Sequence, residues 1–169
     1  MSESQLPPPG TVRPSVRHRT TARVLPVRPD GKVLLLHGWD PLKPQTPYWF
    51  TIGGGVESGE TVAEAAGREL REEVGIVLPI DALGTPVATN TIEFEWGGCR
   101  IVQHQTFFAV AVDRVDVTFA NQEELELQTI SAHGWWYGDD LEATGQAAHA
   151  TIPGMLRRAA DVITLRRAS

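Results

Sequence analysis

The apolar positions of the chain recur with two different periods. Segments typical of strands lie at 21–27, 32–38, 48–52, 85–96, 99–112 and 133–138, and amphipathic segments typical of helices lie at 61–74 and 152–167. Strands dominate the centre, with one helix between them and one after them. This order predicts an α+β fold, in which helices pack on the faces of a mixed sheet.

Glycine and proline predict how the strands are joined. Asp30-Gly31 and Gly97-Gly98 each separate two strand segments, and both dipeptides are suited to the positive φ angles of a tight hairpin turn. Pro26 predicts that the first strand lies at a sheet edge or a bulge, because proline donates no ladder hydrogen bond. Three prolines in WDPLKPQTP predict a loop at 39–47.

The predicted helix at 61–74 carries an unusual charge pattern. At 100° per residue, Glu69, Glu72 and Glu73 cluster beside the core-facing stripe, and Glu73 falls near its apolar edge, where a carboxylate needs a partner. Gly67 costs about 1 kcal/mol relative to alanine, so either close packing requires it or the position tolerates it. The core-facing stripe consists of Val62, Ala66, Leu70 and Val74.

Three carboxylates within two helical turns make a hard-oxygen cluster suited to Mg²⁺ or Mn²⁺. The alternative is a solvated acidic face, which is the usual role of a run of charges. The glycines that precede the helix favour the metal site, because residues without a β-carbon let the backbone approach a ligand closely.

These residues resemble the Nudix box, which they reproduce without a gap from Gly54 to Ile76. Glu60 follows Gly54 after five residues, and Arg68-Glu69-Leu70, Glu72-Glu73 and Gly75-Ile76 follow at the spacing of that motif. The resemblance implies a Nudix-like α/β/α sandwich around a central mixed β-sheet. It also implies Mg²⁺- or Mn²⁺-dependent hydrolysis of a diphosphate (pyrophosphate) linkage in a nucleoside diphosphate derivative.

The resemblance further implies roles for individual residues. Arg68 would orient the carboxylates through ion pairs, and Glu60 would brace the loop against the helix. The general base varies among Nudix enzymes, and Glu93 and Glu95 are candidates on the predicted hairpin. Further candidate bases are Glu123, Glu124 and Glu126, and the expected metal ligands are Glu69, Glu72, Glu73 and the Gly54 carbonyl.

Residues outside the box are candidates for substrate contacts. The rings of Trp39 and Tyr48 stand beside the proline-rich loop and could stack on a base, whereas Trp49 and Phe50 alternate, so that at least one belongs to the core. Candidate phosphate contacts are Arg23, Lys43 and Arg100. We expect structural or exposed roles for His18, His37, His104, His133 and His149, which show no metal-ligand spacing.

Composition limits the class of protein. The 169 residues are 41% hydrophobic with a net charge of −6, which predicts one domain at 16–169 after a disordered tail at 1–15, and no broad nucleic-acid surface. No apolar run is long enough for a membrane span and no secretory signal is evident, so we expect a cytoplasmic protein. A small-molecule nucleotide substrate and a homodimer are expectations from the family resemblance.

Two other functions compete with hydrolysis. One is a catalytically silent Nudix domain that binds a nucleotide as a sensor, and the other is a non-hydrolytic Nudix-fold enzyme such as an isomerase. The intact box favours the hydrolase over both, because this chain keeps every box carboxylate.

Overall fold

The computed structural model describes residues 15–113, 117–119 and 130–169. Most of the predicted tail at 1–15 therefore lies outside the described residues, and the tail stays a prediction. In chain order the elements are β1 (Val16–Val27), β2 (Val33–Gly38), β3 (Tyr48–Phe50), β4 (Ile52–Gly55), α1 (Val62–Val74), the 3₁₀ helix η1 (Ile80–Leu83), β5 (Ala88–Trp96), β6 (Cys99–Ala111), β7 (Ile130–Trp136), α3 (Gly138–Thr144) and α4 (Ile152–Arg167).

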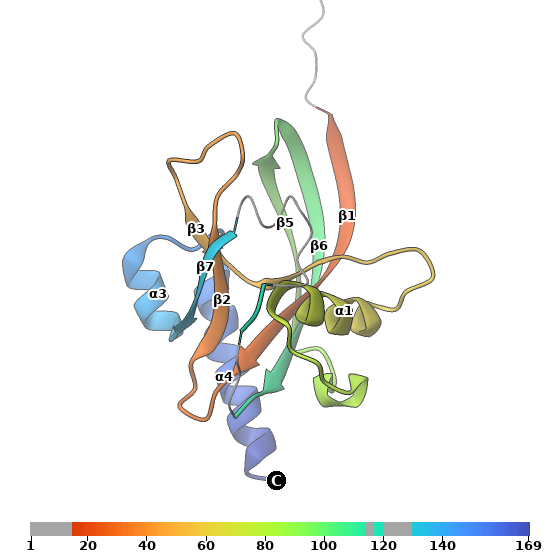
Figure 1. Ribbon diagram of the computed structural model, residues 1–169, viewed down its shortest axis with the longest axis vertical. Coiled ribbons are helices and arrows are strands. Elements are labelled where there is room, and N and C mark those ends of the chain that lie inside the picture. The colour runs from red at the N-terminus through yellow and green to blue at the C-terminus, as the bar shows by residue number, and fades with distance from the viewer. Residues whose placement is uncertain (1–14, 114–116, 120–129) are drawn as a thin grey trace, which may run out of the picture.

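The strands of the described chain form one mixed sheet with the order β3-β2-β1-β6-β5 (Figure 1). β4 pairs with β1, and β7 pairs with β2. β1 and β6 are parallel along their whole length, whereas the other pairs are antiparallel. The predicted strand at 48–52 is two strands, because β3 pairs with β2 and β4 pairs with β1. The predicted α+β class with a mixed sheet is confirmed.

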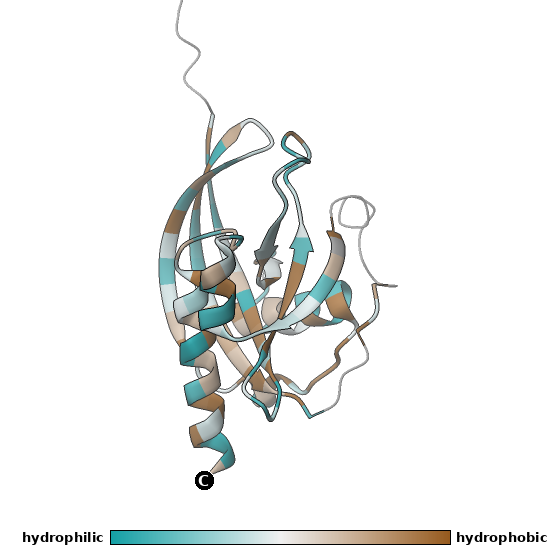
Figure 2. Cartoon of the chain, turned by 90° about the vertical axis from the view of Figure 1, so that its left-hand side faces the viewer, coloured by the Kyte–Doolittle hydropathy of each residue, from teal (hydrophilic) through white to brown (hydrophobic). Residues whose placement is uncertain are grey.

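Helices cover both faces of the sheet, with α1 on one side and α4 on the other (Figure 1). Leu34 and Leu36 on β2 belong to the core that includes α1, whereas Val33 and Leu35 belong to the core that includes α4. Burial on both faces explains why these strands read as continuous apolar runs instead of alternating ones. Figure 2 shows hydrophilic and hydrophobic residues interleaved along α4, as its amphipathic sequence predicted. None of the described helices is long and apolar enough to cross a membrane.

The prediction that Pro26 marks an edge or a bulge is wrong, since β1 lies in the interior of the sheet. The Val27 carbonyl accepts a hydrogen bond from the β6 side, from the N–H of Val112 at 2.9 Å, so the backbone of Pro26 faces the other way. On that side, the pairing of β1 with β4 extends only as far as Val24, which lies opposite Ile52. The pairing of β1 with β2 starts at Val27, which lies opposite Val33. Proline is tolerated there because the missing N–H falls between the two partner strands.

Both predicted hairpins form, but their turns differ. Gly97 and Gly98 have φ angles of 58° and 78°, as the prediction required. In the turn between β1 and β2 only Gly31 has a positive φ, 85°, and Asp30 does not. The Gly31 N–H donates to the Arg28 carbonyl at 2.9 Å, so one left-handed glycine closes a longer loop.

Helix α1 begins and ends where the sequence predicted. The Thr61 hydroxyl accepts from the Glu64 N–H at 3.2 Å, and the Glu64 carboxylate accepts from the Thr61 N–H at 2.7 Å, which forms a capping box. The helix stops at Gly75, whose φ is 74°. Strong caps at both ends fix the rotational position of the glutamates relative to the sheet.

The question of Gly67 is settled by its surroundings, because a β-carbon added there would meet nothing within 4 Å. Gly67→Ala should therefore raise the free energy of unfolding by about 1 kcal/mol, since alanine is the better helix former. Gly138→Ala is the matched control, because its β-carbon would lie 2.5 Å from the Pro153 carbonyl oxygen. Urea denaturation should show opposite shifts for the two variants, and a loss of stability in Gly67→Ala would contradict the open packing.

Candidate active site

Helix α1 buries two of its carboxylates against β4. Glu69 is only 7% exposed and Glu73 only 4%, so the alternative of a solvated acidic face is wrong for both. Glu73 Oε2 accepts a hydrogen bond from the backbone N–H of Gly53 at 2.7 Å. A buried carboxylate needs such a partner, because losing its hydration without compensation is costly. The glutamates thus face the strand that precedes the helix instead of the solvent.

Two glycines of β4 make this close approach sterically feasible. Gly53 has a φ of 135°, and a β-carbon there would lie 2.0 Å from the Ala22 carbonyl oxygen. At Gly54 a β-carbon would lie 2.4 Å from Glu69 Oε1. At Gly55, in contrast, a β-carbon would meet nothing within 4 Å. Glycine is therefore required at Gly53 by the backbone of β1, whereas at Gly54 a β-carbon would force the end of the Glu69 side chain to move.

The strand register decides which backbone carbonyl faces the carboxylates. Gly53 donates its N–H to Glu73, and its carbonyl accepts from Arg23 Nη1 at 2.9 Å. Backbone groups of successive strand residues point to opposite sides, and Gly54 is paired with Ala22 of β1. The Gly54 carbonyl, which we expected to be a metal ligand, therefore faces the β1 ladder, whereas the Gly53 carbonyl lies on the glutamate side.

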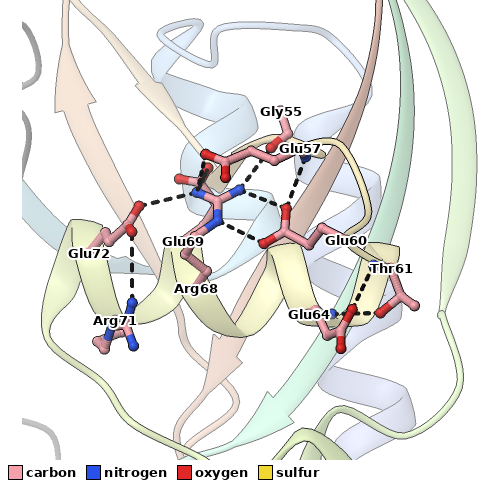
Figure 3. A network of polar contacts seen from close by, with 9 residues as sticks. All are labelled: Gly55, Glu57, Glu60, Thr61, Glu64, Arg68, Glu69, Arg71 and Glu72. Carbon is pink, nitrogen blue, oxygen red and sulfur yellow. Dashed lines mark hydrogen bonds and ion pairs between the residues drawn. The ribbon is translucent and has the colours of Figure 1, made fainter.

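Arg68 links the box loop to the helix (Figure 3). Its guanidinium donates to both oxygens of Glu60 at 2.8 and 3.0 Å, to Glu69 at 2.8 Å, to Glu72 at 3.1 Å and to the Gly55 carbonyl at 2.9 Å. The hydrogen bonds to Glu60 above all raise the pKa of Arg68, and in return they lower the pKa of Glu60. Glu64 is used for the helix cap instead of pairing with Arg68.

Arg23 approaches the same glycines from β1. Its guanidinium donates to the Thr51 carbonyl at 3.2 Å as well as to Gly53. Burial lowers the pKa of Arg23 to about 10, although the nearby Glu73 carboxylate opposes this shift. Its Nε atom is buried and has no hydrogen-bond partner among the described residues. An arginine placed in this way is costly to fold, which is typical of functional sites.

A cavity of about 470 Å³ opens beside the glycines and Glu73. This volume is within the range of small-molecule sites in proteins. Arg100 does not line the cavity, because it lies at the start of β6 and pairs with Glu93. Trp49 packs against His37 and Trp136 in the core. Apart from the box residues Gly54 and Glu73, the binding or catalytic candidates and aromatic residues singled out from the sequence that line the cavity are Arg23, Trp39, Lys43, Tyr48, Phe50 and Glu95.

The sequence analysis missed several polar residues of the cavity, and four of them form part of one hydrogen-bonded chain. Arg19, Gln103, Gln105 and His149 all line it, although His149 was expected to be structural or exposed. A signal was present for the two glutamines, because they share one face of a strand that is otherwise strongly apolar. No pattern in the sequence indicated His149. Its place in the cavity depends on tertiary contacts of the segment before α4, in which the Ala148 N–H donates to the Trp49 carbonyl.

The carboxylates suit a divalent cation by their chemistry. Among the described residues, no three His, Cys, Asp or Glu side chains are already arranged to hold a metal ion, since Arg68 engages Glu69 and Glu72. The donor atoms are nevertheless the hard oxygens that Mg²⁺ and Mn²⁺ prefer, and the missing β-carbon at Gly54 leaves room for Glu69. The candidate bases Glu123, Glu124 and Glu126 lie outside the described residues.

Comparison with known proteins gives a consistent assignment. Residues 17–152 match the model of the NUDIX domain. YvcI of Bacillus subtilis, an uncharacterized Nudix hydrolase, is 47% identical over 49 residues, which cover 29% of this chain and 28% of YvcI. The nucleoside triphosphatase NudI of an Escherichia coli strain is 43% identical over 60 residues, covering 36% of this chain and 42% of NudI. The chain thus spans less than half the length of these curated relatives.

The likeness in fold extends much further along the chain. A crystal structure of a MutT protein from Methanosarcina mazei Go1 superposes with a TM-score of 0.59 over 89% of this chain and 96% of that chain. The two sequences are only 17% identical, so this match concerns the fold alone.

Gly54→Ala should displace the Glu69 carboxylate, because the new β-carbon would overlap it. We expect a loss of about 1–3 kcal/mol in the free energy of unfolding, because the displaced carboxylate is buried and would lose its hydrogen bond from Arg68. Gly55→Ala provides the control and should change stability by less than about 0.5 kcal/mol, since its β-carbon enters open space. Urea denaturation and a crystal structure of Gly54→Ala would test this, and equal stability of the two variants would refute the close approach.

Glu60→Gln should lower the free energy of unfolding by about 1–3 kcal/mol at pH 7, because it removes a charged partner of Arg68. Since Arg68 lowers the pKa of Glu60 from 4.5, the contribution is complete above that value and disappears as the pH falls through the folded-state pKa. The difference in the free energy of unfolding between Glu60→Gln and the wild type should therefore shrink below about pH 4.

Urea denaturation across a pH series measures this dependence. Glu142→Gln serves as the control, because it removes a carboxylate from a more exposed pair with Arg157, which contributes little. If the loss of unfolding free energy in Glu60→Gln stayed constant from pH 7 to pH 3, the negative charge of Glu60 would not be what stabilises the protein.

Proposed function

Because the chain belongs to the Nudix family, we propose that it is a Nudix-type diphosphohydrolase that cleaves a diphosphate linkage in a nucleoside diphosphate derivative with Mg²⁺ or Mn²⁺. One observation supports this activity above all others. Glu69 and Glu73 are buried against the glycines of β4, next to a cavity of about 470 Å³ that Glu73 itself lines. A helix with only a structural role would have no need for two such costly carboxylates.

The proposed metal ligands are Glu69, Glu72 and Glu73, together with one backbone carbonyl of β4. We place that carbonyl at Gly53 in preference to Gly54, because Gly53 has both backbone groups on the glutamate side. Divalent cations, when bound, would neutralise the diphosphate and lower the pKa of the attacking water.

Arginines on either side of the glycines position this set. Arg68 holds Glu69 and Glu72 through one guanidinium, so the two carboxylates keep a fixed relation to each other. Glu60 anchors Arg68 to the loop, and Arg23 holds the Gly53 carbonyl from the opposite side. These contacts hold the carboxylates and the carbonyl near one another, and a cation would replace Arg68 at Glu69 and Glu72.

The cavity supports a small nucleotide as the substrate. Trp39 and Tyr48 provide aromatic surface for a base or sugar, while Arg23 and Lys43 provide positive charge for phosphates. The similarity to the nucleoside triphosphatase NudI agrees with a nucleotide substrate. The cytoplasmic location, the homodimer and the identity of the general base stay predictions.

Glu72→Gln and Glu73→Gln should each lower the turnover number by about a hundredfold or more, because they remove negative charge where the metal is needed. The assay measures phosphorylated products from nucleotide sugars, ADP-ribose, dinucleoside polyphosphates, capped RNA and nucleoside triphosphates. Glu64→Gln on the same helix is the matched control, since glutamine at that position keeps the capping box.

Different outcomes separate the competing functions. Wild-type turnover in either variant would show that the metal ligands are wrongly assigned. Complete inactivity of the wild type across the panel, with Mg²⁺ and with Mn²⁺, would favour the nucleotide-binding sensor.

A further inference from the structure

A continuous chain of polar side chains crosses the cavity away from the box. Arg19 Nε donates to Gln103 at 2.6 Å, and Gln103 Nε2 donates to Gln105 at 2.6 Å. Gln105 Nε2 then donates to Asn90 at 2.9 Å, and Asn90 Nδ2 donates to the Thr151 hydroxyl at 3.4 Å. The chain continues to His149, whose Nδ1 lies 2.9 Å from that hydroxyl.

The direction of this chain cannot reverse, because it begins at an arginine. A guanidinium only donates, so the amide oxygen of Gln103 must face Arg19 and its amide nitrogen must face Gln105. The same constraint then passes from Gln105 to Asn90 and from Asn90 to Thr151. Gln103 and Gln105 are almost completely buried, which restrains their rotamers.

The far end of the chain fixes the tautomer of His149. The Thr151 hydroxyl oxygen accepts a hydrogen bond from Asn90, and its O–H is left to donate a hydrogen bond to His149 Nδ1. The backbone N–H of Thr151 also donates to Nδ1, at 3.3 Å. Since Nδ1 is an acceptor for both groups, the neutral ring carries its proton on Nε2. His149 therefore offers an N–H donor from the cavity wall.

His149 is connected to Asn90 of β5 through Thr151, across the sheet from the glycines of β4. The chain begins on β1, which pairs with the glycines of β4, and crosses β6 to β5 before it reaches the segment ahead of α4. Neighbouring strands are about 4.8 Å apart, so β5 is about 10 Å from β1. With the diphosphate at the glutamates, the part of a nucleotide that reaches His149 is the edge of the base farthest from its phosphates.

We propose that His149 selects nucleotides whose base presents an oxo group at that edge, such as uracil and hypoxanthine, over bases that present an amino group, such as cytosine and adenine. This inference rests on the proposed function in one respect, the orientation of a nucleotide with its phosphates at the box. An oxo group accepts the Nε2–H, whereas an amino group would place two donors against each other and leave both unsatisfied.

Nucleotide binding without catalysis tests the preference directly. Isothermal titration with Mg²⁺ present would compare UMP with CMP and IMP with AMP, which are pairs of equal ring size that differ in the exocyclic group and contain no diphosphate linkage to cleave. We expect the wild type to bind the oxo member of each pair about tenfold more tightly, which corresponds to about 1.4 kcal/mol. His149→Ala should reduce this ratio to about one.

Two further variants make the test specific. His149→Phe keeps a ring in the wall but removes the donor, so it should lose the preference even if His149→Ala folds poorly. His104→Ala is the matched control, because His104 lies between Gln103 and Gln105 on the exposed face of β6 and should leave the ratio unchanged.

The outcomes distinguish this inference from the proposed hydrolysis. An equal or reversed preference in the wild type, a ratio unaffected in both His149 variants, or no binding of any of the four nucleotides would overturn the role of His149. A protein that binds UMP and IMP preferentially but hydrolyses nothing with Mg²⁺ or Mn²⁺ would refute the enzyme while the base selection stands.

Discussion

The structure depends on the burial of two like-charged carboxylates of one helix against the glycines of strand β4. Glu69 and Glu73 would repel each other and lose hydration there unless backbone N–H groups and guanidinium groups compensated. Gly53 supplies the N–H, and Gly54 supplies the space that Glu69 occupies. The pairing of β4 with β1 and the capped start of α1 hold these two surfaces in contact.

Charge balance at this contact comes from two arginines with different environments. Arg68 is surrounded by carboxylates, so its charge is strongly stabilised and it fixes their geometry. Arg23 is instead buried among carbonyls, where its charge is disfavoured and its pKa falls. Such an arrangement sacrifices stability locally, and a negatively charged ligand that approached Arg23 would recover part of that cost.

In the proposed function, the cavity separates the reaction chemistry from the selection of the base. One side of the cavity is formed by α1 with its carboxylates and by the glycines of β4, which are adjacent in sequence. The opposite wall combines β5, β6 and the segment before α4. The directional hydrogen-bond chain from Arg19 to His149 connects the two sides and fixes which atoms of the far wall donate. Changes in that wall would alter the preferred base without disturbing the box, which is how one fold can serve many substrates.

Local pattern was sufficient for the helices α1 and α4, for most of the strands and for the box, but it did not separate β3 from β4. The helix from Thr61 to Gly75 follows from its caps, and its periodicity placed Glu73 at the core edge, where the structure has it buried. The pairing of β1 with β6 at the centre of the sheet depended instead on contacts between residues about eighty positions apart. Those pairings put Pro26 in the interior, left Arg100 outside the cavity and brought His149 into it. Periodicity reports which face of an element is buried; which element covers that face is determined only when the whole sheet assembles.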